Sequence, residues 1–245
     1  MAERKPHGEV YTVVYATIVC LICSLALAAA TAGLRPRQDR MAELDRRFNV
    51  LKAFGAPVVD AAGRRAPAGE IERLYTEHVR ERVISESSGA PVENRRPSDL
   101  TDADRAAGLL PVYEWVEEGR VTRYAIPISG KGLWSTIYGF LALDGDLERI
   151  IGVTFYKHGE TPGLGGEIER DAFTAQFRDR RVVRDRELLP IIVAKGAAAP
   201  AERQAEDRIV VDGISGATLT GRGVQEFMNA DLRRYAAFIR HRRGG

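Results

Sequence analysis

Residues 208–228, with the sequence RIVVDGISGATLTGRGVQEFM, join a short apolar run, a glycine-rich loop and the start of an amphipathic helix. The run before the loop is β-branched, whereas the apolar residues after the loop recur at helical spacing. A loop between a strand and a helix presents backbone N–H groups and the positive end of the helix dipole to anions. Because hydroxyl groups at Ser215, Thr218 and Thr220 add hydrogen-bonding capacity, the stretch predicts an anion-binding site. The alternative is an ordinary turn in which Thr218 or Thr220 caps the final helix.

Short β-branched and aromatic runs upstream of this stretch predict a mainly antiparallel sheet. Hairpin signals at 117–120 (EEGR) and 144–146 (DGD) join neighbouring runs. Helical periodicity covers 167–177 and 223–240. We therefore expect an α+β domain over 111–245, in which helices flank a mainly antiparallel sheet. The predicted strands are 112–116, 121–128, 135–143, 150–157 and 188–195.

An apolar run near the start of the chain predicts a membrane anchor. From Val10 to Leu34 there is no charged residue and no histidine. As a helix rising about 1.5 Å per residue, the run spans roughly 37 Å, enough to cross a hydrocarbon core about 30 Å thick. We expect an N-terminal tail over 1–9 and a transmembrane helix over 10–34. The alternative is a cleaved signal peptide, because a basic pair precedes the run and small residues at 30–33 resemble a cleavage site.

The two cysteines of the chain, Cys20 and Cys23, both lie inside this apolar run, which excludes a disulfide-stapled fold. We expect them to pack as small apolar side chains, since a metal or redox role needs polar neighbours that the run lacks. Residues 35–110 are predicted to form a membrane-proximal region, with helices over 41–54 and 69–83 and a surface loop from 84 onward. Arginines are more numerous after the anchor than before it, which favours a cytoplasmic main domain.

Composition excludes several classes of function. The chain has 245 residues, 44% of them hydrophobic, and a formal net charge of +2 without a long basic tract, so we expect a globular protein that does not bind nucleic acid. It lacks the glycine patterns of dinucleotide-binding and P-loop sites, and it has too few cysteines to hold an iron–sulfur cluster. No nucleophile and base are paired in the sequence, and we predict neither a catalytic side chain nor a metal ligand set.

The loop after residue 211 resembles the D-x-x-[S/T]-G-A-[S/T] flavinylation motif of FMN-binding domains in the sodium-translocating NADH:quinone reductase and its Rnf relatives. The resemblance implies that one FMN per chain is joined by a phosphoester to Thr218, with Leu219 and Thr220 beside it. The other matching residues are Asp212, Ser215, Gly216 and Ala217.

Two further segments resemble the same family. The loop HGETPGLG at 158–165 is similar to its H-x-E-T-P-G-L-G loop, which implies that Leu164 covers the flavin ring and that Glu160 and Thr161 lie near its polar edge, with Gly163 in the turn. As an alternative, His158 and Glu160 would be metal ligands, although no third ligand is evident. The segment GKGLWSTIYG at 130–139 is similar to G-x-G-L-W-x-x-x-Y-G, which implies that Trp134 lies against the flavin. The alternative is that Trp134 fills the core.

These resemblances favour the C subunits of the sodium-translocating enzyme over their Rnf counterparts, the G subunits. They imply an electron carrier within a six-subunit NADH:ubiquinone reductase of the bacterial inner membrane, with A, B, D, E and F type partner subunits. They also imply a single-pass chain whose FMN-binding domain is extracytoplasmic and periplasmic. This location disagrees with the excess of arginines after the anchor, which favours a cytoplasmic domain. A separate flavin transferase that uses FAD is implied as well. Two alternatives remain open: a membrane-anchored flavin sensor, and a scaffold protein whose glycine-rich loops are only turns.

Overall fold

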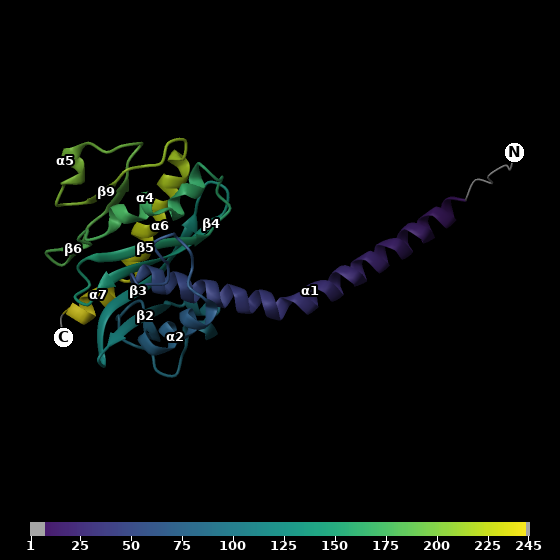
Figure 1. Cartoon of the computed structure of the whole chain (residues 1–245), viewed down its shortest axis with the longest axis horizontal. Helices are drawn as coiled ribbons and strands as arrows, with labels where there is room; N and C mark the ends of the chain where they lie inside the picture. Colours follow the sequence, from purple (N-terminus) through teal and green to yellow (C-terminus); the bar gives the residue numbers. More distant parts are fainter. Residues whose placement is uncertain (1–7, 244–245) are drawn as a thin grey trace. The chain divides into compact units, whose positions relative to one another are not determined.

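The computed structural model describes residues 8–243 (Figure 1). The chain divides into two compact units, Met1–Asp45 and Arg46–Gly245. The second unit contains a five-stranded antiparallel sheet with helices packed against it, so the predicted α+β class is confirmed.

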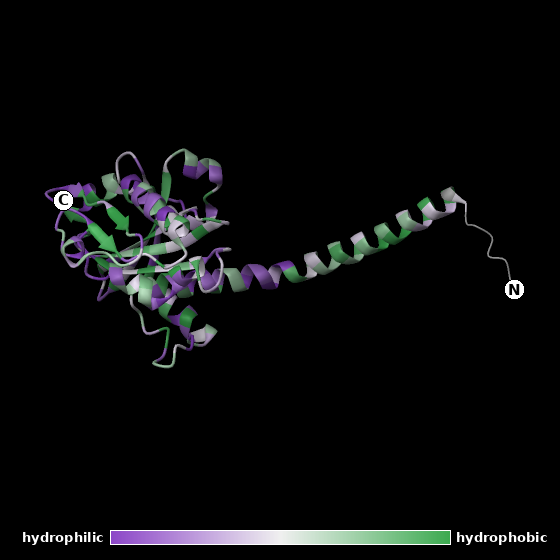
Figure 2. Ribbon diagram, turned by 90° about the horizontal axis from the view of Figure 1, so that it is seen from above, coloured by the Kyte–Doolittle hydropathy of each residue, from purple (hydrophilic) through white to green (hydrophobic). Residues whose placement is uncertain are grey.

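The first helix, α1, runs from Glu9 to Ala53 and includes the predicted anchor and all but the last residue of the predicted helix over 41–54. Pro36 lies inside it. A proline removes one backbone hydrogen bond, yet here the helix continues through it, so the two predicted helices are one. By length and composition, Val10–Ala53 can cross a membrane. Figure 2 shows the apolar residues of its N-terminal part followed by a hydrophilic stretch, and Cys20 and Cys23 are exposed and unbonded.

The helix predicted over 69–83 is shorter than expected. Helix α2 covers Ala68–His78, and β1 covers Val79–Ser85. Strand β1 pairs antiparallel with β2 (Leu109–Glu117), from Val79 opposite Trp115 to Ser85 opposite Leu109. The helical spacing of the apolar residues was misleading over 79–83. This stretch contains β-branched residues, and its pairing with a neighbouring strand outweighs the local helical pattern. The surface loop predicted over 84–110 is only partly a loop, since its ends lie in β1 and β2, and Pro97–Asp99 (η1) and Asp102–Ala106 (α3) are short helices.

The central sheet has the strand order β1-β2-β3-β4-β5. Its later strands are β3 (Arg120–Lys131), β4 (Thr136–Asp144) and β5 (Ile150–Lys157), so the four predicted runs from 112 to 157 are confirmed as strands. The turn from β2 to β3 uses Glu118 and Gly119, both with positive φ, as the hairpin signal predicts.

The segment after β5 is made of short elements. The predicted helix over 167–177 is three short helices, and the predicted strand over 188–195 is divided between two strands, β7 and β8. Strand β8 pairs in parallel with β9, so these two strands form a separate small sheet. The elements are η2 (Gly165–Glu169), α4 (Asp171–Thr174), η3 (Ala175–Phe177), β6 (Val183–Arg184), β7 (Glu187–Leu188), β8 (Ile191–Val193), α5 (Pro200–Arg203) and β9 (Ile209–Val211).

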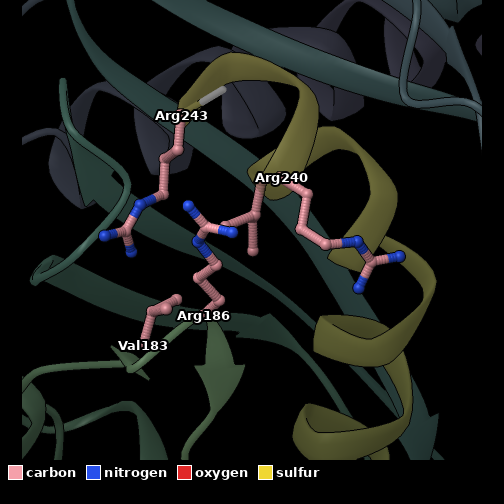
Figure 3. Close-up of a pocket in the computed structure, with 5 residues that line it drawn as sticks. Val183, Arg186, Arg240 and Arg243 are labelled. Atoms are coloured by element: carbon pink, nitrogen blue, oxygen red, sulfur yellow. The ribbon is translucent and has the colours of Figure 1, made fainter. Parts of the chain in front are cut away.

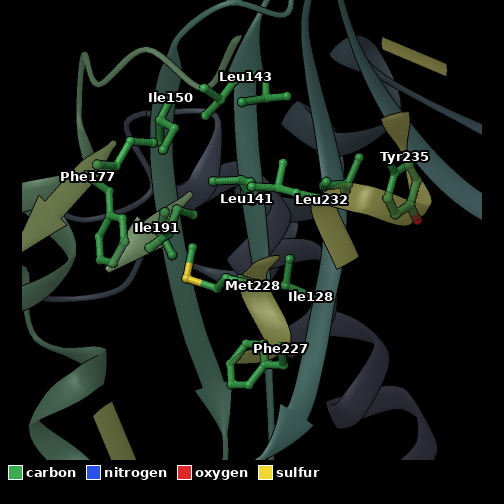
Figure 4. Close-up of a cluster of buried hydrophobic side chains, with 14 of the residues drawn as sticks. Ile128, Leu141, Leu143, Ile150, Phe177, Ile191, Phe227, Met228, Leu232 and Tyr235 are labelled. Carbon is green, nitrogen blue, oxygen red and sulfur yellow. The ribbon is translucent and has the colours of Figure 1, made fainter. Parts of the chain in front are cut away.

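The helix predicted over 223–240 begins earlier and is interrupted. Helix α6 runs from Thr218 to Arg234, and α7 from Ala236 to Arg243. Helix α6 packs against β3, and its apolar side chains enter the main core. Figure 4 shows this cluster, in which Phe227, Met228 and Leu232 of α6 face residues of the sheet such as Ile128 and Leu141. This packing fixes the position of the first turn of α6.

Gly223 allows the close approach of α6 to β3. A Cβ at this position would lie 2.3 Å from the carbonyl oxygen of Lys131. We expect Gly223→Ala to lower the free energy of unfolding by about 1–3 kcal/mol, because the overlap with backbone exceeds the gain in helix propensity. Gly69→Ala is the matched control: a Cβ there meets nothing within 4 Å, and the same change should stabilise α2 by about 0.5–1 kcal/mol. Urea unfolding of the full chain in detergent measures both, and equal stabilisation by the two changes would contradict the prediction.

Candidate functional site

Three segments that lie far apart in the sequence meet at the first turn of α6. They are the end of β3 with the β3–β4 turn (130–135), the loop after β5 with the start of η2 (158–166), and the loop before α6 with its first turns (212–223). Glycines make the approach possible, since a Cβ on Gly132 would lie 2.5 Å from Oε1 of Glu160, and one on Gly165 would lie 2.6 Å from Oγ1 of Thr220. The structure therefore brings together the three segments that carry the sequence motifs.

The Glu160 carboxylate links all three segments. Its side chain is buried, with 5% of the residue exposed. One oxygen accepts the backbone N–H groups of Trp134 (3.0 Å) and Ser135 (3.4 Å). The other accepts the N–H of Leu133 (3.2 Å) and the hydroxyl of Thr220 (2.6 Å). One side chain thus fixes the β3–β4 turn against the first turn of α6.

The pKa of Glu160 reflects two opposed effects. Burial raises it, whereas the hydrogen bonds from the Thr220 hydroxyl and the three backbone N–H groups lower it, and the net result lies below the ordinary value of 4.5. The carboxylate is therefore ionised at neutral pH, so it acts only as an acceptor toward its four donors.

The start of α6 leaves one hydroxyl group available. Ala217 is the N-cap residue, and no side chain caps the helix, so the interpretation in which Thr218 or Thr220 acts as a cap is wrong. The Thr220 hydroxyl donates to Glu160, but within residues 8–243 the exposed Thr218 side chain has no hydrogen bond. Gly216 has a φ of +73°, a conformation that glycine adopts without strain. The first turn of α6 therefore offers backbone N–H groups without helical acceptors together with the exposed Thr218 hydroxyl.

Residues 132–233 match the family of FMN-binding domains. Over most of its length the chain is also similar to curated proteins named as C subunits of the Na⁺-translocating NADH-quinone reductase. The relative from Yersinia pestis is 34% identical, covering 94% of this chain and 91% of its own. The relative from Pseudomonas aeruginosa is 31% identical, with 96% of each chain covered. The chain belongs to this family of C subunits, the NqrC family.

Solved structures of the NqrC family share the fold. The crystal structure of the C subunit from Parabacteroides distasonis superposes with a TM-score of 0.71 at 27% identity, covering 84% of this chain and 96% of that one. The structure of Shewanella oneidensis NqrC is similar in fold, with a TM-score of 0.65 at 24% identity.

The surroundings of Thr218 suit FMN. A phosphate is stabilised at a helix N-terminus, where N–H groups are unsatisfied and the helix dipole is positive. Large apolar side chains are exposed on the same three segments. A Cβ on Gly216 would lie 2.8 Å from Cδ2 of Leu164, so that side chain adjoins the loop that carries Thr218. We call this set the apolar collar: Leu133, Trp134, Leu164 and Leu219, with exposed fractions of 40%, 69%, 43% and 58%.

The exposure of Trp134 excludes one of its two interpretations. A tryptophan that fills the core would be buried, so that interpretation is wrong for this member of the NqrC family. Exposed aromatic and aliphatic groups beside an anion site are what a flat ring joined to a phosphate needs.

Other predicted site residues shape the loops. The Asp212 carboxylate accepts the N–H of Ala198 (2.8 Å) and pairs with Arg203 (3.3 Å), so it fixes the segment before β9. Thr161 is exposed, and its carbonyl oxygen accepts the N–H of Leu164 (3.1 Å) in a turn where Gly163 has a φ of +75°. Ser215 is exposed, whereas Ala217 is buried beneath the first turn of α6.

Sequence reasoning missed two residues of the site. Ser135 accepts the N–H of Gly159 through its hydroxyl (2.5 Å), and Leu133 belongs to the apolar collar. The GLWSTIYG motif contains both, but neither a serine nor a leucine suggests a ring contact from sequence in the way its tryptophan does. The described residues contain no group of three or more His, Cys, Asp or Glu side chains that could hold a metal ion. Nδ1 of His158 instead accepts the N–H of Glu160 (3.3 Å).

Proposed function

We propose that the chain is an electron-carrying subunit of a Na⁺-translocating NADH:ubiquinone reductase and that it carries one FMN joined to Thr218 by a phosphoester. The observation that supports this most directly is the exposed Thr218 hydroxyl, without a hydrogen bond to residues 8–243, on the first turn of α6. The next hydroxyl, Thr220, is buried and bonded to Glu160 (2.6 Å). Only one of the two threonines is free to be modified.

The attachment transfers the FMN portion of FAD, through its phosphorus, to the oxygen of Thr218. In this proposal a separate flavin transferase uses FAD as the donor, and the Thr218 oxygen forms a new bond to the FMN phosphorus. The bond between the two phosphates of FAD breaks, AMP leaves, and the hydroxyl proton is taken up by the solvent or the transferase. No oxidant is needed, because no atom changes oxidation state.

The residues around Thr218 position and shield the cofactor. FMN supplies one- and two-electron chemistry when bound. The backbone N–H groups and dipole of α6 stabilise the phosphate. Trp134 and Leu164 cover apolar ring surface, and the ionised Glu160 fixes the turn that carries Trp134. The contacts proposed from the sequence are Thr218, Asp212, Ser215, Gly216, Ala217, Leu219, Thr220, Glu160, Thr161, Gly163, Leu164 and Trp134.

The proposal includes a location and partners. Residues 1–9 would be a tail and 10–34 the anchor in the bacterial inner membrane, followed by a proximal region over 35–110 and a periplasmic FMN-binding domain over 111–245. The long apolar helix and the membership of the NqrC family support membrane attachment. The NADH and quinone sites would lie on the other five subunits of the enzyme, so this chain relays electrons between their centres.

A mass measurement tests the attachment. Chain purified from its native host is digested with trypsin, which releases the peptide spanning 209–222. We expect this peptide to carry the mass of one FMN less one water, with fragment ions that place it on Thr218. A denatured band should also show flavin fluorescence. A peptide of unmodified mass, from a host with active flavin transferase, would contradict the proposal and favour a scaffold.

A further inference from the structure

Two adjoining hollows lie between the β6–β7 hairpin and α7. The larger has a volume of about 560 Å³ and the smaller about 240 Å³. They share four lining residues: Val183, Arg186, Ile239 and Arg240. We call the two together the Arg186 hollow. Its apolar walls come from Val183 and Ile239, with Leu188 in the smaller part.

The Arg186 hollow carries an excess of positive charge. Arg186, Arg240 and Arg243 line it, and Glu187 is the one acidic residue among its described lining residues. Arg243 pairs with Glu148 (2.7 Å). Within residues 8–243, neither Arg186 nor Arg240 has an ion pair or a side-chain hydrogen bond. Figure 3 shows the side chains of Arg186 and Arg243 extending toward the same region, with the head of Arg240 directed away from them.

The backbone at Arg186 is strained. Strands β6 and β7 pair with Arg184 opposite Glu187, which leaves Asp185 and Arg186 as a two-residue turn. Both have positive φ, 51° and 71°. Such turns favour Asn-Gly or Asp-Gly, and an arginine at the second position carries a conformational cost that glycine avoids. A strained residue whose guanidinium lines a hollow and has no partner among residues 8–243 suggests a functional reason for its place.

This hollow is distinct from the flavin site. Thr218 begins α6, which has 17 residues, and the Arg186 hollow is lined by α7, which follows the other end of α6. A helix of that length spans roughly 25 Å. A ligand in the hollow therefore does not occupy the space around Thr218.

We propose that the Arg186 hollow binds a phosphate-bearing anion that has an apolar portion. Guanidinium groups bind phosphate oxygens through paired, charge-assisted hydrogen bonds, and Arg186 and Arg243 are placed to supply them. The walls formed by Val183, Leu188 and Ile239 accept the apolar portion. A soluble organic phosphate and the headgroup of an anionic lipid share this chemistry, and the experiment separates the two.

The test uses the full chain in neutral-detergent micelles and measures binding by titration with two probes. One probe is inorganic pyrophosphate, and the other is phosphatidylglycerol added to the micelles. We expect saturable binding of at least one probe, weakened about tenfold by Arg186→Gly and by Arg243→Gln. Saturation by pyrophosphate alone indicates a soluble ligand, and saturation by the lipid alone indicates a headgroup.

Arg233→Gln is the matched control, because Arg233 is an exposed arginine of α6 that does not line the hollow. It should change the affinity less than twofold. Arg186→Gly should also leave the melting temperature unchanged or raise it, since glycine fits the turn. The proposal is wrong if neither probe saturates, or if Arg233→Gln weakens binding as much as Arg186→Gly.

Discussion

Thr218→Ala is expected to remove the proposed covalent flavin from the chain completely. The hydroxyl that would form the phosphoester is gone, and the neighbouring Thr220 hydroxyl cannot replace it because it is buried and donates to Glu160. The complex should then lose NADH-driven quinone reduction in membranes. Flavin fluorescence of the denatured chain and the rate of quinone reduction are the two measurements.

Two controls separate loss of attachment from loss of folding. Thr218 is exposed, so its change to alanine should alter the free energy of unfolding by no more than about 0.5 kcal/mol. Thr218→Ser keeps a hydroxyl and should keep the flavin, whereas Ser215→Ala removes an exposed hydroxyl three residues away and should also keep it. A fluorescent band that persists in Thr218→Ala would place the attachment elsewhere.

The sequence was sufficient where chemistry is local. The strands from 112 to 157 follow from β-branched alternation and turn residues, and the loop at 212–218 by itself indicates Thr218 as the proposed attachment residue. The sequence was insufficient where contacts between distant segments determine the secondary structure. Strand β1 contains residues whose spacing suits a helix, and only the neighbouring β2 makes Val79–Ser85 extended. The local spacing of apolar residues carries no information about which strand is the neighbour in the sheet.

The site shows the same division. Glu160 and Thr220 are 60 positions apart, and nothing in either motif indicates that their side chains meet at 2.6 Å. The sequence interpretation placed both beside the cofactor. In the structure the Thr220 hydroxyl donates a hydrogen bond to the Glu160 carboxylate, which leaves Thr218 as the exposed threonine at the start of α6. The Arg186 hollow was missed altogether, because its arginines come from a hairpin turn and a helix about 50 positions further on.

Glu160→Gln is expected to lower the free energy of unfolding by about 2–4 kcal/mol, since two donors meet each carboxylate oxygen. An amide has one oxygen and one NH₂ group. In either orientation the NH₂ group faces a backbone N–H, that of Leu133 or those of Trp134 and Ser135, and at least one partly buried donor loses its acceptor. The turn that carries Trp134 should loosen, and the yield of flavin attachment should fall although Thr218 is intact.

The pH dependence distinguishes the loss of this charge from general disruption. Because the pKa of Glu160 in the folded chain lies below its ordinary value of 4.5, ionised Glu160 contributes its full stabilisation above that value and loses it as the pH falls through the folded pKa. The difference in urea midpoint between the wild-type chain and Glu160→Gln should therefore be constant from pH 8 to about pH 5 and narrow in more acidic solution.

Glu169→Gln is the matched control, a glutamate of the neighbouring short helix with 55% of its side chain exposed. It should shift stability by about 0.5 kcal/mol or less at any pH. A deficit for Glu160→Gln that stays constant down to pH 3 would show that shape, and not the negative charge, holds the three segments together.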